Sequence, residues 1–446
     1  MFENKKIFIL GMARSGYEAA KFLSSLNNKI ILNDANKEQD EQHIQELEKL
    51  GVEVILGSHP DEIFTSDFDY LIKNPGIKDT HKYVEFAHKN NIKVINEMEL
   101  AYYFLNKKNA NIVGITGTNG KTTTTTLIYE IIKKSGRRVH LTGNIGYPVT
   151  GFLNDVKNND YIVTEVSIQQ LVNLHEFRPH IAVLTNISEA HIDHVGSFEN
   201  YKNTKKKIFQ KQDNNDYAII NKENDDCIDI TSDINSTKLY FSSKDKADIY
   251  LKDGFIYYKD EKYINTNEIK LVGNHNYENI MCAIIACKLL GIDDKYIKEV
   301  ITTFNGVEHR LEYVEDVNGR IFYNDSKATN NKSTMIALSA FNKPTILLMG
   351  GLDRGLSFDE LAPYMKNVKF VVAFGQTKNK IKDFCNKFNI ECEVVENLEK
   401  ATYLAYKISE SGDIILLSPA CASWDQYKRF EDRGLEFKKL INSLKK

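Results

Sequence analysis

The sequence predicts an α/β protein whose parallel sheets carry helices on both faces. Short apolar runs recur along the whole chain, for example at residues 7–10, 112–116 and 414–417, and helix-length amphipathic stretches separate them. Continuous apolar runs of this length are typical of strands that are buried on both sides in parallel α/β units. Many of these runs end in Gly, Asn, Asp or Ser, so we expect ligands to bind at the carboxyl ends of the strands.

Three domains are expected along the 446 residues, because one domain commonly takes roughly 100–200 residues. Residues 1–97 contain five strand-like runs and predict a Rossmann-like domain. Residues 98–306 predict a central P-loop domain with a mixed sheet, in which the polar segment 213–272 forms an antiparallel subsheet. A hairpin pattern near 308–330 opens a third, Rossmann-like domain over residues 307–446.

Composition excludes several classes of function. Lys and Arg number 58 against 61 Asp and Glu, and the net charge of -3 provides no global field for nucleic acid or an anionic membrane. No apolar stretch approaches the roughly 18 residues of a membrane helix, and the first apolar run meets Gly11 without the long apolar segment of a signal peptide. The six cysteines lack CxxC or zinc-ligand spacing, so we expect reduced, structural thiols. We expect a cytosolic monomer whose partners are small molecules, with neither nucleic-acid binding nor membrane insertion.

A glycine-rich turn after the strand at residues 111–116 is the strongest local signal for phosphate binding. Its backbone N–H groups can hold phosphate oxygens, Lys121 can reach the terminal phosphates of a nucleoside triphosphate, and a threonine hydroxyl can bind Mg²⁺. The strict G-x-x-x-x-G-K-[ST] pattern is not met, because Ile115 stands six positions before Lys121. We interpret the segment as a variant P-loop; a structural glycine turn that contains a lysine is the alternative. The loop residues are Gly117, Thr118, Asn119, Gly120, Lys121, Thr122 and Thr123.

A carboxylate, a histidine and a lysine follow the P-loop along the chain. Glu165 ends the strand at residues 161–165, where a carboxylate is well placed to bind Mg²⁺, although a helix N-cap or a surface acid would look the same. His191 and Lys205 come from polar segments, and taken alone each is better explained as a surface side chain. Their interpretation therefore depends on the order in which the motifs occur.

The order of these motifs resembles the central domain of the Mur ligases, and the P-loop variant also resembles the related folylpolyglutamate synthetases. Gly-Lys-Thr at residues 120–122 precedes Asn-Ile-x-x-x-His-x-Asp-His at 186–194 and Tyr-x-x-x-Lys at 201–205, as in that family. The resemblance implies ATP and Mg²⁺ as cofactors, with Lys121 and Thr122 on the phosphates and the metal.

The same resemblance implies that Glu165 and His191 ligate magnesium. It also implies that Lys205 is carbamylated, which turns an ammonium into a carboxylate-like Mg²⁺ ligand. Asn276 and Asn279, one turn apart on a predicted helix, would line the adenine-nucleotide site, whereas the residues alone are explained equally well by helix capping.

The first domain contains a second, weaker nucleotide-binding pattern. A glycine turn at Gly11 precedes a predicted helix, and Asp34 ends the next strand about 20 residues later, as in dinucleotide-binding units. Position 13 is Ala, so Gly-x-Gly-x-x-Gly is absent and a nicotinamide oxidoreductase is the weaker interpretation. The resemblance implies a UDP-sugar site here, and a turn or capping role is the alternative for each residue. The residues assigned to this substrate are Arg14, Ser15, Asp34, Asn74 and Gly76, with Asn144, Ser167 and Gln170 of the central domain.

The third domain offers positive charge beside a polar loop. Lys327 and Arg310 together could neutralise a transferring phosphoryl group, while a turn or an N-cap explains Asp325 by itself. Ser423 is expected at the start of a helix, where it would act as an N-cap or bind a substrate carboxylate.

Two segments of this domain, residues 324–330 and 417–434, resemble the Mur ligases that attach D-glutamate. Arg354 stands where some relatives carry a lysine, which preserves the charge and changes its geometry. The resemblance assigns Asp325 and Arg310 to the nucleotide, and it assigns D-glutamate to Thr329, Arg354, Ser423 and Phe430.

The resemblance as a whole implies an ATP-dependent ligase of peptidoglycan precursor synthesis. ATP would phosphorylate the carboxylate of UDP-N-acetylmuramoyl-L-alanine, and the amine of D-glutamate would attack the acyl phosphate. The alternatives are another Mur ligase, a ligase similar to folylpolyglutamate synthetase, or a P-loop ATPase that acts as a binding module. The residues expected to carry catalysis are Lys121, Lys205, His191, Lys327 and Arg310.

Overall fold

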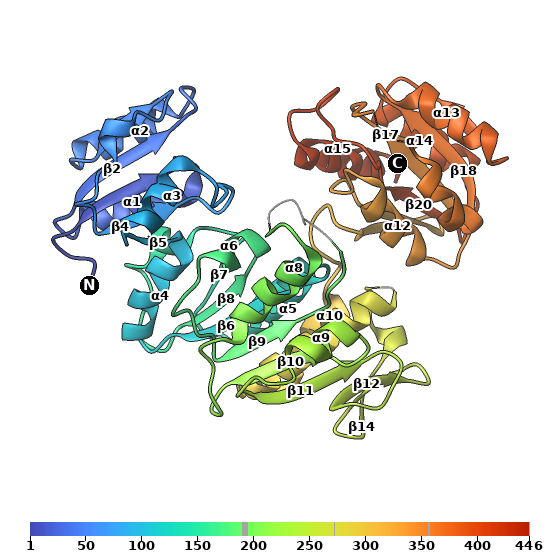
Figure 1. Cartoon of the computed structure of the whole chain (residues 1–446). Coiled ribbons are helices and arrows are strands. Elements are labelled where there is room, and N and C mark those ends of the chain that lie inside the picture. The colour runs from blue at the N-terminus through green and yellow to red at the C-terminus, as the bar shows by residue number, and fades with distance from the viewer. Residues whose placement is uncertain (190–194, 272, 356, 446) are drawn as a thin grey trace. The chain divides into compact units, whose positions relative to one another are not determined.

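The computed structural model describes residues 1–189, 195–271, 273–355 and 357–445 (Figure 1). The chain forms two compact units, one made of Met1–Ile264 with Glu278–Val300 and the other of Asn265–Tyr277 with Ile301–Lys446. Strands of the described residues form sheets of five, nine and six strands, which confirms the α/β class. No helix in the described ranges combines the length and the apolar character that crossing a membrane requires. All six cysteines are buried as free thiols.

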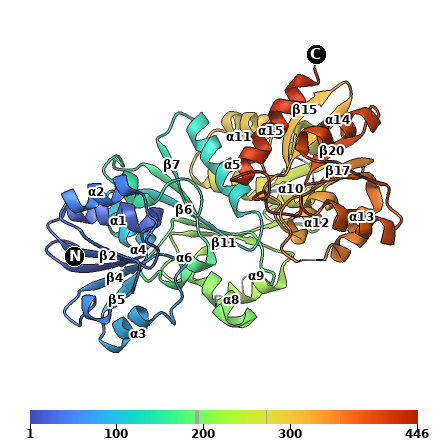
Figure 2. The same cartoon turned by 90° about the horizontal axis from the view of Figure 1, so that it is seen from above.

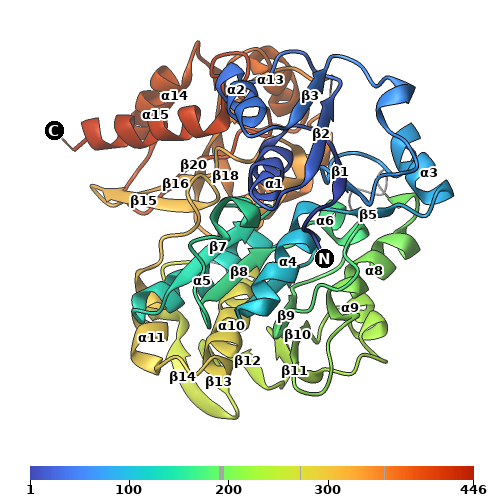
Figure 3. The ribbon, with the colours of Figure 1, turned by 90° about the vertical axis from the view of Figure 1, so that its left-hand side faces the viewer.

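The first unit begins with a five-stranded parallel sheet. Its strands are β1 (Lys6–Leu10), β2 (Lys29–Asp34), β3 (Glu53–Leu56), β4 (Tyr70–Lys73) and β5 (Lys93–Ile95), in the order β3-β2-β1-β4-β5. The helices are α1 (Arg14–Ser24), α2 (Glu41–Lys49), α3 (Lys82–Lys89) and α4 (Glu97–Lys107). Along β1, Ile7 and Ile9 enter one apolar core and Phe8 and Leu10 enter another, so both faces are buried. Figure 3 shows α1 and α3 on opposite faces of this sheet.

A nine-stranded mixed sheet follows in the same unit, with the order β14-β13-β12-β11-β10-β9-β6-β8-β7. The strands are β6 (Asn111–Thr116), β7 (Val139–Gly143), β8 (Tyr161–Glu165), β9 (Ile181–Leu184), β10 (Tyr217–Asn221), β11 (Thr237–Ser242), β12 (Ile249–Lys252), β13 (Phe255–Tyr258) and β14 (Glu261–Asn265). The helices are α5 (Lys121–Lys134), α6 (Ile168–Val172), α8 (Phe198–Lys206), α9 (Asp225–Ile230), α10 (Asn274–Leu289) and α11 (Asp294–Thr303). The start of α10, up to Tyr277, and the end of α11, from Ile301, belong to the second unit. Short 3₁₀ turns lie at Asp61–Ile63, Val149–Phe152 and Lys207–Phe209 of the first unit and at Thr266–Glu268 of the second.

The antiparallel part of this sheet is smaller than the sequence pattern predicts. Within the polar segment 213–272, β10 pairs with β11 and β11 with β12 in parallel, and the antiparallel pairing with β13 begins at β12. The parallel pairing of β10 and β11 follows from α9, because a helical crossover returns the chain in the same direction. Strands β10 to β12 therefore continue the parallel sheet, and the antiparallel pairing is formed by β12 with β13.

The second unit contains a six-stranded sheet with the order β15-β16-β20-β17-β18-β19. The elements are β15 (Glu312–Val317), β16 (Arg320–Asn324), β17 (Thr345–Gly350), β18 (Val368–Phe374), β19 (Cys392–Val394), β20 (Ile414–Leu417), α12 (Asn331–Ser339), a 3₁₀ segment (Asp359–Asn367), α13 (Lys378–Lys387), α14 (Leu398–Ile408) and α15 (Phe430–Ser443). β15 and β16 form the expected hairpin, and the other pairings are parallel. Helices α12 and α13 cover one face and α14 and α15 the other (Figure 2).

Candidate active site

The P-loop lies between β6 and α5, and both of its flanking glycines adopt backbone conformations that favour glycine. Gly117 has φ +145° and Gly120 has φ +83°. A Cβ at Gly117 would lie 1.9 Å from Thr185 Oγ1, and a Cβ at Gly120 would lie 2.2 Å from Asn279 Oδ1. The loop therefore leaves no room for side chains at these two positions, and it presents backbone N–H groups at the N-terminus of α5, as a phosphate site requires.

Side chains that follow β9 hold the loop in this conformation. Thr185 Oγ1 donates to the carbonyl of Asn119 at 2.6 Å, and Asn186 Oδ1 accepts the N–H of Asn119 at 2.9 Å. On the other side of the loop, the hydroxyls of Thr118 and Tyr201 lie 3.0 Å apart. The loop is thus ordered by contacts from β9 and α8 before any ligand binds.

Two lysine amines meet at one carbonyl oxygen of the loop. Lys121 Nζ lies 2.9 Å from the carbonyl oxygen of Gly117, and Lys205 Nζ of α8 lies 2.8 Å from the same oxygen. Lys205 is fully buried, and burial together with the charge of Lys121 lowers the pKa of Lys205 well below its usual range. Two ammonium groups this close repel each other, so the arrangement favours a bound anion or a neutral Lys205.

Glu165 ends β8 with a carboxylate that is only partly satisfied. The side chain is 1% exposed, and Oε1 accepts a hydrogen bond from Asn144 Nδ2 at 2.7 Å. Oε2 is buried and has no hydrogen-bond partner in the part of the chain that the structure describes. Burying a carboxylate oxygen without a hydrogen-bond partner costs free energy. The position of Oε2 therefore indicates that a hydrogen-bond donor or a cation binds there.

Helix α10 places one of the two predicted asparagines against the P-loop. Asn279 Oδ1 accepts a hydrogen bond from Thr124 Oγ1 at 3.2 Å, beside the position where Gly120 lacks a Cβ. Asn276 is buried in the first turn of the same helix and belongs to the second unit, so its nucleotide role stays a prediction. His191 lies outside the described residues, and its role also stays a prediction.

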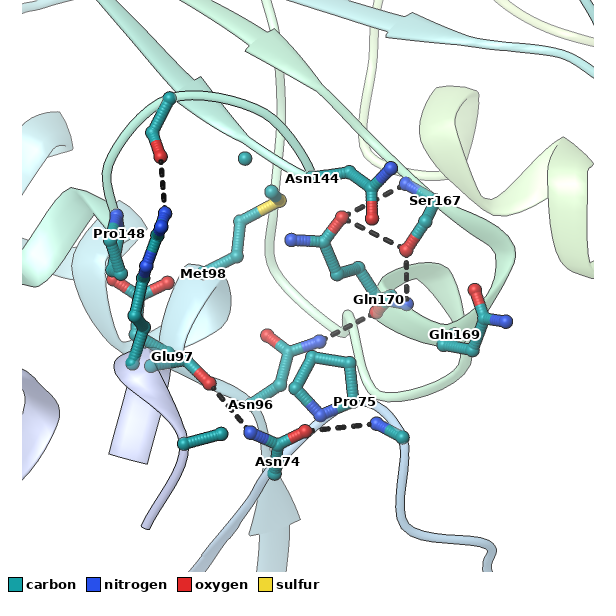
Figure 4. A pocket seen from close by; sticks show the side chains of 16 residues that line it. Asn74, Pro75, Asn96, Glu97, Met98, Asn144, Pro148, Ser167, Gln169 and Gln170 are labelled. Carbon is teal, nitrogen blue, oxygen red and sulfur yellow. Dashed lines mark hydrogen bonds between the residues drawn. The ribbon is translucent and has the colours of Figure 1, made fainter. Parts of the chain in front are cut away.

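A cavity of about 440 Å³ opens in the first unit (Figure 4). Its lining comes from the ends of β1, β4 and β5 and from the segments that follow β7 and β8. Seven of the eight residues assigned to the UDP-sugar line it: Arg14, Ser15, Asn74, Gly76, Asn144, Ser167 and Gln170. The structure therefore brings together residues that lie up to about 150 positions apart in the sequence.

Asp34 is the eighth residue, and it lies outside the lining of the cavity. Its Oδ2 accepts the N–H of Met12 at 2.7 Å, and its Oδ1 accepts the N–H of Asn36 at 2.8 Å. Both oxygens thus fix the backbone that surrounds the first glycine turn. A contact between Asp34 and a UDP-sugar stays a prediction.

The other cavity residues also hold each other in place. Asn74 Nδ2 donates to Ser15 Oγ at 3.1 Å, and Arg14 donates to the carbonyl of Gly146 at 3.4 Å. Ser167 and Gln170 form a reciprocal capping box at the start of α6. The capping box is one of the roles that the sequence left open as alternatives, and all of these contacts position side chains around the cavity.

The second unit carries a loop after β16 whose central acid is fully enclosed. Asp325 Oδ1 accepts the N–H of Leu311 at 3.1 Å, and Oδ2 accepts the hydroxyl of Ser418 at 2.8 Å. Burial raises the pKa of Asp325 to about 7, against the opposing charges of Arg310 and Arg433. Asp325 therefore fixes the loop itself, and its predicted contact with the nucleotide is not tested by this geometry.

Predicted cationic and substrate residues flank this loop. Lys327 Nζ lies 5.7 Å from the ring centroid of Phe430, which places two predicted residues side by side. Thr329 is half-buried and donates its N–H to the carbonyl of Lys327 at 2.9 Å. Arg310 is half-buried and close enough to Asp325 to lower its pKa.

The expectation that Ser423 begins a helix is wrong. Ser423 heads a turn in which its carbonyl accepts the N–H groups of Gln426 and Tyr427, and α15 begins only at Phe430. The hydroxyl of Ser423 is buried and has no hydrogen-bond partner among the described residues. A buried hydroxyl without a partner, in the loop after β20, is suited to a ligand. The role of Ser423 in binding the substrate therefore stays a prediction, although its role as an N-cap is wrong.

Comparison with known proteins assigns every part of this architecture to one family. Residues 5–96 match the N-terminal domain of MurD-like Mur ligases, residues 115–287 the Mur ligase middle domain, and residues 309–421 the Mur ligase glutamate ligase domain. The UDP-N-acetylmuramoylalanine–D-glutamate ligase of Geobacillus sp. (strain WCH70) is 46% identical, covering 100% of this chain and 99% of the relative. The chain belongs to the Mur ligase family. The ligase of the same name from Staphylococcus aureus (strain MW2) is 45% identical over 98% of this chain and 96% of its own.

Solved Mur ligases confirm the fold. The UDP-N-acetylmuramate–alanine ligase MurC of Thermotoga maritima matches with a TM-score of 0.61 at 19% identity, over 98% of this chain and 99% of its own. The MurF ligase of Thermotoga maritima, solved in complex with ADP, matches with a TM-score of 0.57 at 19% identity, over 93% and 95%. At this level of identity the likeness concerns the α/β fold alone.

One structural residue of this Mur ligase escaped the sequence reasoning. Arg433 of α15 is fully buried, and its guanidinium donates to Ser326 Oγ at 3.0 Å and to the carbonyls of Ser326, Gly350 and Cys421. It thereby joins the loops that follow β16, β17 and β20. The available signal was the spacing of Arg433, three residues after Phe430 and four before Phe437, which is the spacing of residues on one face of a helix.

Glu97 is a second missed residue, and it gives this Mur ligase a testable pH dependence. Its carboxylate lines the cavity and accepts the N–H and hydroxyl of Thr150 at 2.6 and 2.8 Å. Burial raises the pKa of Glu97 from 4.5 to about 7. The folded state therefore holds the proton more tightly than the unfolded state, so the contribution to stability is complete below about pH 4.5 and is lost as the pH rises to about 7.

Replacing Glu97 by Gln should remove that loss. A shift of this size corresponds to about 3 kcal/mol at 1.36 kcal/mol per pKa unit. We therefore expect the difference in unfolding free energy, Glu97→Gln minus wild type, to increase by about 3 kcal/mol between pH 4 and pH 8 in urea unfolding without ligands. Glu48→Gln, at an exposed position of α2, should show a constant difference. A constant difference for Glu97→Gln as well would contradict the assignment.

Proposed function

We propose that this Mur ligase joins D-glutamate to UDP-N-acetylmuramoyl-L-alanine at the expense of ATP, as a step of peptidoglycan precursor synthesis. The observation that carries the proposal is the identity of 45–46% over the full length with ligases named for this reaction. A free carboxylate is a poor electrophile for an amine, so the γ-phosphoryl group of ATP is first transferred to it, which yields an acyl phosphate and ADP. The amine of D-glutamate then attacks the acyl carbon, and phosphate leaves as the amide forms.

The P-loop would hold the phosphates of ATP. Without a Cβ, Gly117 and Gly120 let the loop pack against Thr185 and Asn279. The N-terminus of α5 would direct its N–H groups toward the phosphates. Lys121 would leave the carbonyl of Gly117 for the terminal phosphates, where its charge stabilises the transferring phosphoryl group. Asn279 supports the loop from α10, beside the adenine-nucleotide site that the resemblance assigns to it.

The residues beyond the P-loop fit a magnesium ion. The unpartnered Oε2 of Glu165 is an oxygen ligand of the kind that Mg²⁺ prefers, and the hydroxyl of Thr122 is buried in the first turn of α5. We assign the ion to Thr122, Glu165, His191 and a carbamylated Lys205. When bound, the ion would neutralise charge on the phosphoryl group. Among the described residues no group of three His, Cys, Asp or Glu side chains could hold a metal, which fits a mixed ligand set of this kind.

Carbamylation of Lys205 would remove the electrostatic repulsion between the amines of Lys121 and Lys205. Addition of CO₂ to the neutral amine forms an N–C bond, releases one proton and converts Lys205 into an anion. The fully buried amine shares the carbonyl of Gly117 with Lys121, so the new charge would lie close to a cation that is already present. Tyr201, whose ring centroid lies 4.8 Å from Nζ, would pack beside the modified side chain.

The cavity in the first unit would take the UDP-linked substrate. Its volume of about 440 Å³ is in the range of small-molecule sites. Asn144 lines the cavity and donates to Glu165, so this asparagine links the cavity to the carboxylate that we assign to the metal. A substrate that fills it could present its terminal carboxylate toward the P-loop side of the unit.

The second unit would supply the amino-acid site. Ser423 offers an unpartnered hydroxyl, Thr329 and Phe430 flank Lys327, and Arg354 provides a cation for a carboxylate of D-glutamate. Lys327 and Arg310 would neutralise charge on the phosphoryl group. We further propose that the enzyme acts as a monomer in the cytosol, since one chain carries every residue of the reaction and the reaction consumes ATP.

Phosphate release tests the function. We expect release from ATP to require both UDP-N-acetylmuramoyl-L-alanine and D-glutamate, with the mass of the UDP product increased by one glutamyl residue. L-Glutamate, L-lysine and meso-diaminopimelate serve as controls and should give background release. Equal release with all four amino acids, or none with any of them, would contradict the proposal.

A further inference from the structure

Trp424 is the only tryptophan of the chain, and it stands immediately after the unpartnered Ser423. Its side chain is 64% exposed, which is unusual for so large an apolar surface. The guanidinium carbon of Arg354 lies 4.7 Å from the centre of the Trp424 ring. The exposed indole therefore forms a cation–π contact with the predicted substrate cation.

The guanidinium of Arg354 makes no hydrogen bond or ion pair with any of the residues that the structure describes. The neighbouring Asp353 is engaged elsewhere, since its Oδ1 accepts the N–H of Gly355 at 2.8 Å and lies 3.2 Å from Lys380 Nζ. The N–H donors of Arg354 thus remain available to a ligand, while its guanidinium carbon lies over the indole ring.

Backbone contacts fix both members of the pair. Leu352 N–H donates to the carbonyl of Ala422 at 2.8 Å, which joins the loop of Arg354 to the loop of Trp424. Asp425 Oδ2 accepts the N–H of Gln376 at 2.9 Å, and Gln376 Oε1 accepts the N–H of Asp353 at 3.0 Å. The two loops and the segment after β18 therefore form one connected framework, and this framework carries both Arg354 and Trp424.

We propose that Trp424 is a positioning residue for the acidic amino-acid substrate, acting through Arg354. The contact with the indole would restrict the side chain of Arg354, and the N–H donors of the guanidinium would bind a carboxylate in bidentate fashion. The buried hydroxyl of Ser423, one residue before Trp424, supplies a further donor in the same loop. This inference rests on the proposed function. It adds Trp424 to the residues that determine how tightly the dicarboxylic amino acid binds.

The test is a double-mutant cycle on KM for D-glutamate. Trp424→Leu removes the aromatic face at an exposed position, and we expect KM to rise about 3- to 10-fold with kcat and the KM for ATP unchanged. Trp424→Phe keeps a face and should stay within about 2-fold of wild type. Arg354→Met removes the cation, and in that background Trp424→Leu should change KM by less than about 2-fold. Tyr364→Leu, at another exposed aromatic position of the second unit, is the matched control.

The single tryptophan supplies an independent readout. Its fluorescence in the wild type should change on addition of D-glutamate to the enzyme with ADP and the UDP-linked substrate, and the change should be absent in Arg354→Met. An unchanged KM in Trp424→Leu, or the same rise in both backgrounds, would overturn the inference while D-glutamate-dependent turnover of the wild type upholds the proposed function. A wild type without that turnover would overturn both.

Discussion

Replacing Lys205 by Met is expected to reduce kcat by about 10³-fold or more and to leave the fold intact. The substitution keeps the volume of the side chain and removes the amine that would carry the carbamate. Without that anion, the site loses one ligand of the metal and leaves the charge of the transferring phosphoryl group less neutralised. Because Lys205 is fully buried beside Lys121, methionine also removes an amine that is costly to bury, so the melting temperature should not fall.

The neighbouring Lys206 provides the matched control. It lies on the same helix but is partly exposed and pairs with Asp233 at 2.6 Å, so Lys206→Ala should retain kcat within about 2-fold. A direct readout is the ¹³C signal of a carbamate after equilibration with ¹³C-bicarbonate, which should appear in the wild type and be absent in Lys205→Met. If Lys205→Met keeps more than about a tenth of wild-type kcat, the carbamate has no essential role.

Local motifs explain why much of the first site was predictable from the sequence. The P-loop needs a strand, two glycines and a helix in direct succession, and these lie within residues 111–134. Glu165 was predictable for a similar reason, because a strand pattern that ends in a carboxylate places that group at the ligand-binding edge of a parallel sheet. β6 and β8 pair in parallel, with Ile115 opposite Glu165, so the P-loop and the carboxylate of Glu165 lie at the same edge of the sheet.

The groups that the sequence missed depend on contacts between distant segments. From the sequence Glu97 looks like an ordinary acid in the first turn of a helix. Its pKa is raised only because the folded chain buries it, and the hydrogen bonds from Thr150 oppose that shift. Arg433 lies more than 100 positions from Ser326, which it holds. The contact between Arg354 and Trp424 likewise joins two loops from different strands. No spacing along the chain encodes such contacts.

Turn geometry explains the one wrong expectation about a site residue. A serine before a polar, helix-compatible stretch is typical of an N-cap, but the carbonyl of Ser423 closes a turn with Tyr427 and the chain reaches a helix only at Phe430. The helix is delayed because the segment between them joins the loops of the sheet, with Asp425 bound to Gln376. A site on a loop is set by tertiary contacts, which local preferences do not reveal.

Glu165→Gln is the second large effect that we expect, and it should separate activity from stability. Glutamine can keep the hydrogen bond from Asn144 through its oxygen, while the negative charge at the position of Oε2 is lost. If that oxygen serves a cation, kcat should fall by at least about 10²-fold at saturating ATP. The ligand-free enzyme should lose little stability, because the carboxylate oxygen that is removed has no hydrogen-bond partner among the described residues.

The comparison that decides this prediction uses both readouts on the same variants. Glu176→Gln, which breaks only an exposed ion pair with Lys211, should change neither kcat nor the melting temperature appreciably. Magnesium titration of the ATP reaction should require a higher Mg²⁺ concentration in Glu165→Gln than in the wild type, since a ligand charge is missing. A variant that melts several degrees lower with an unchanged magnesium requirement would assign Glu165 to the support of Asn144 and the cavity, and the metal would then have to be held without it.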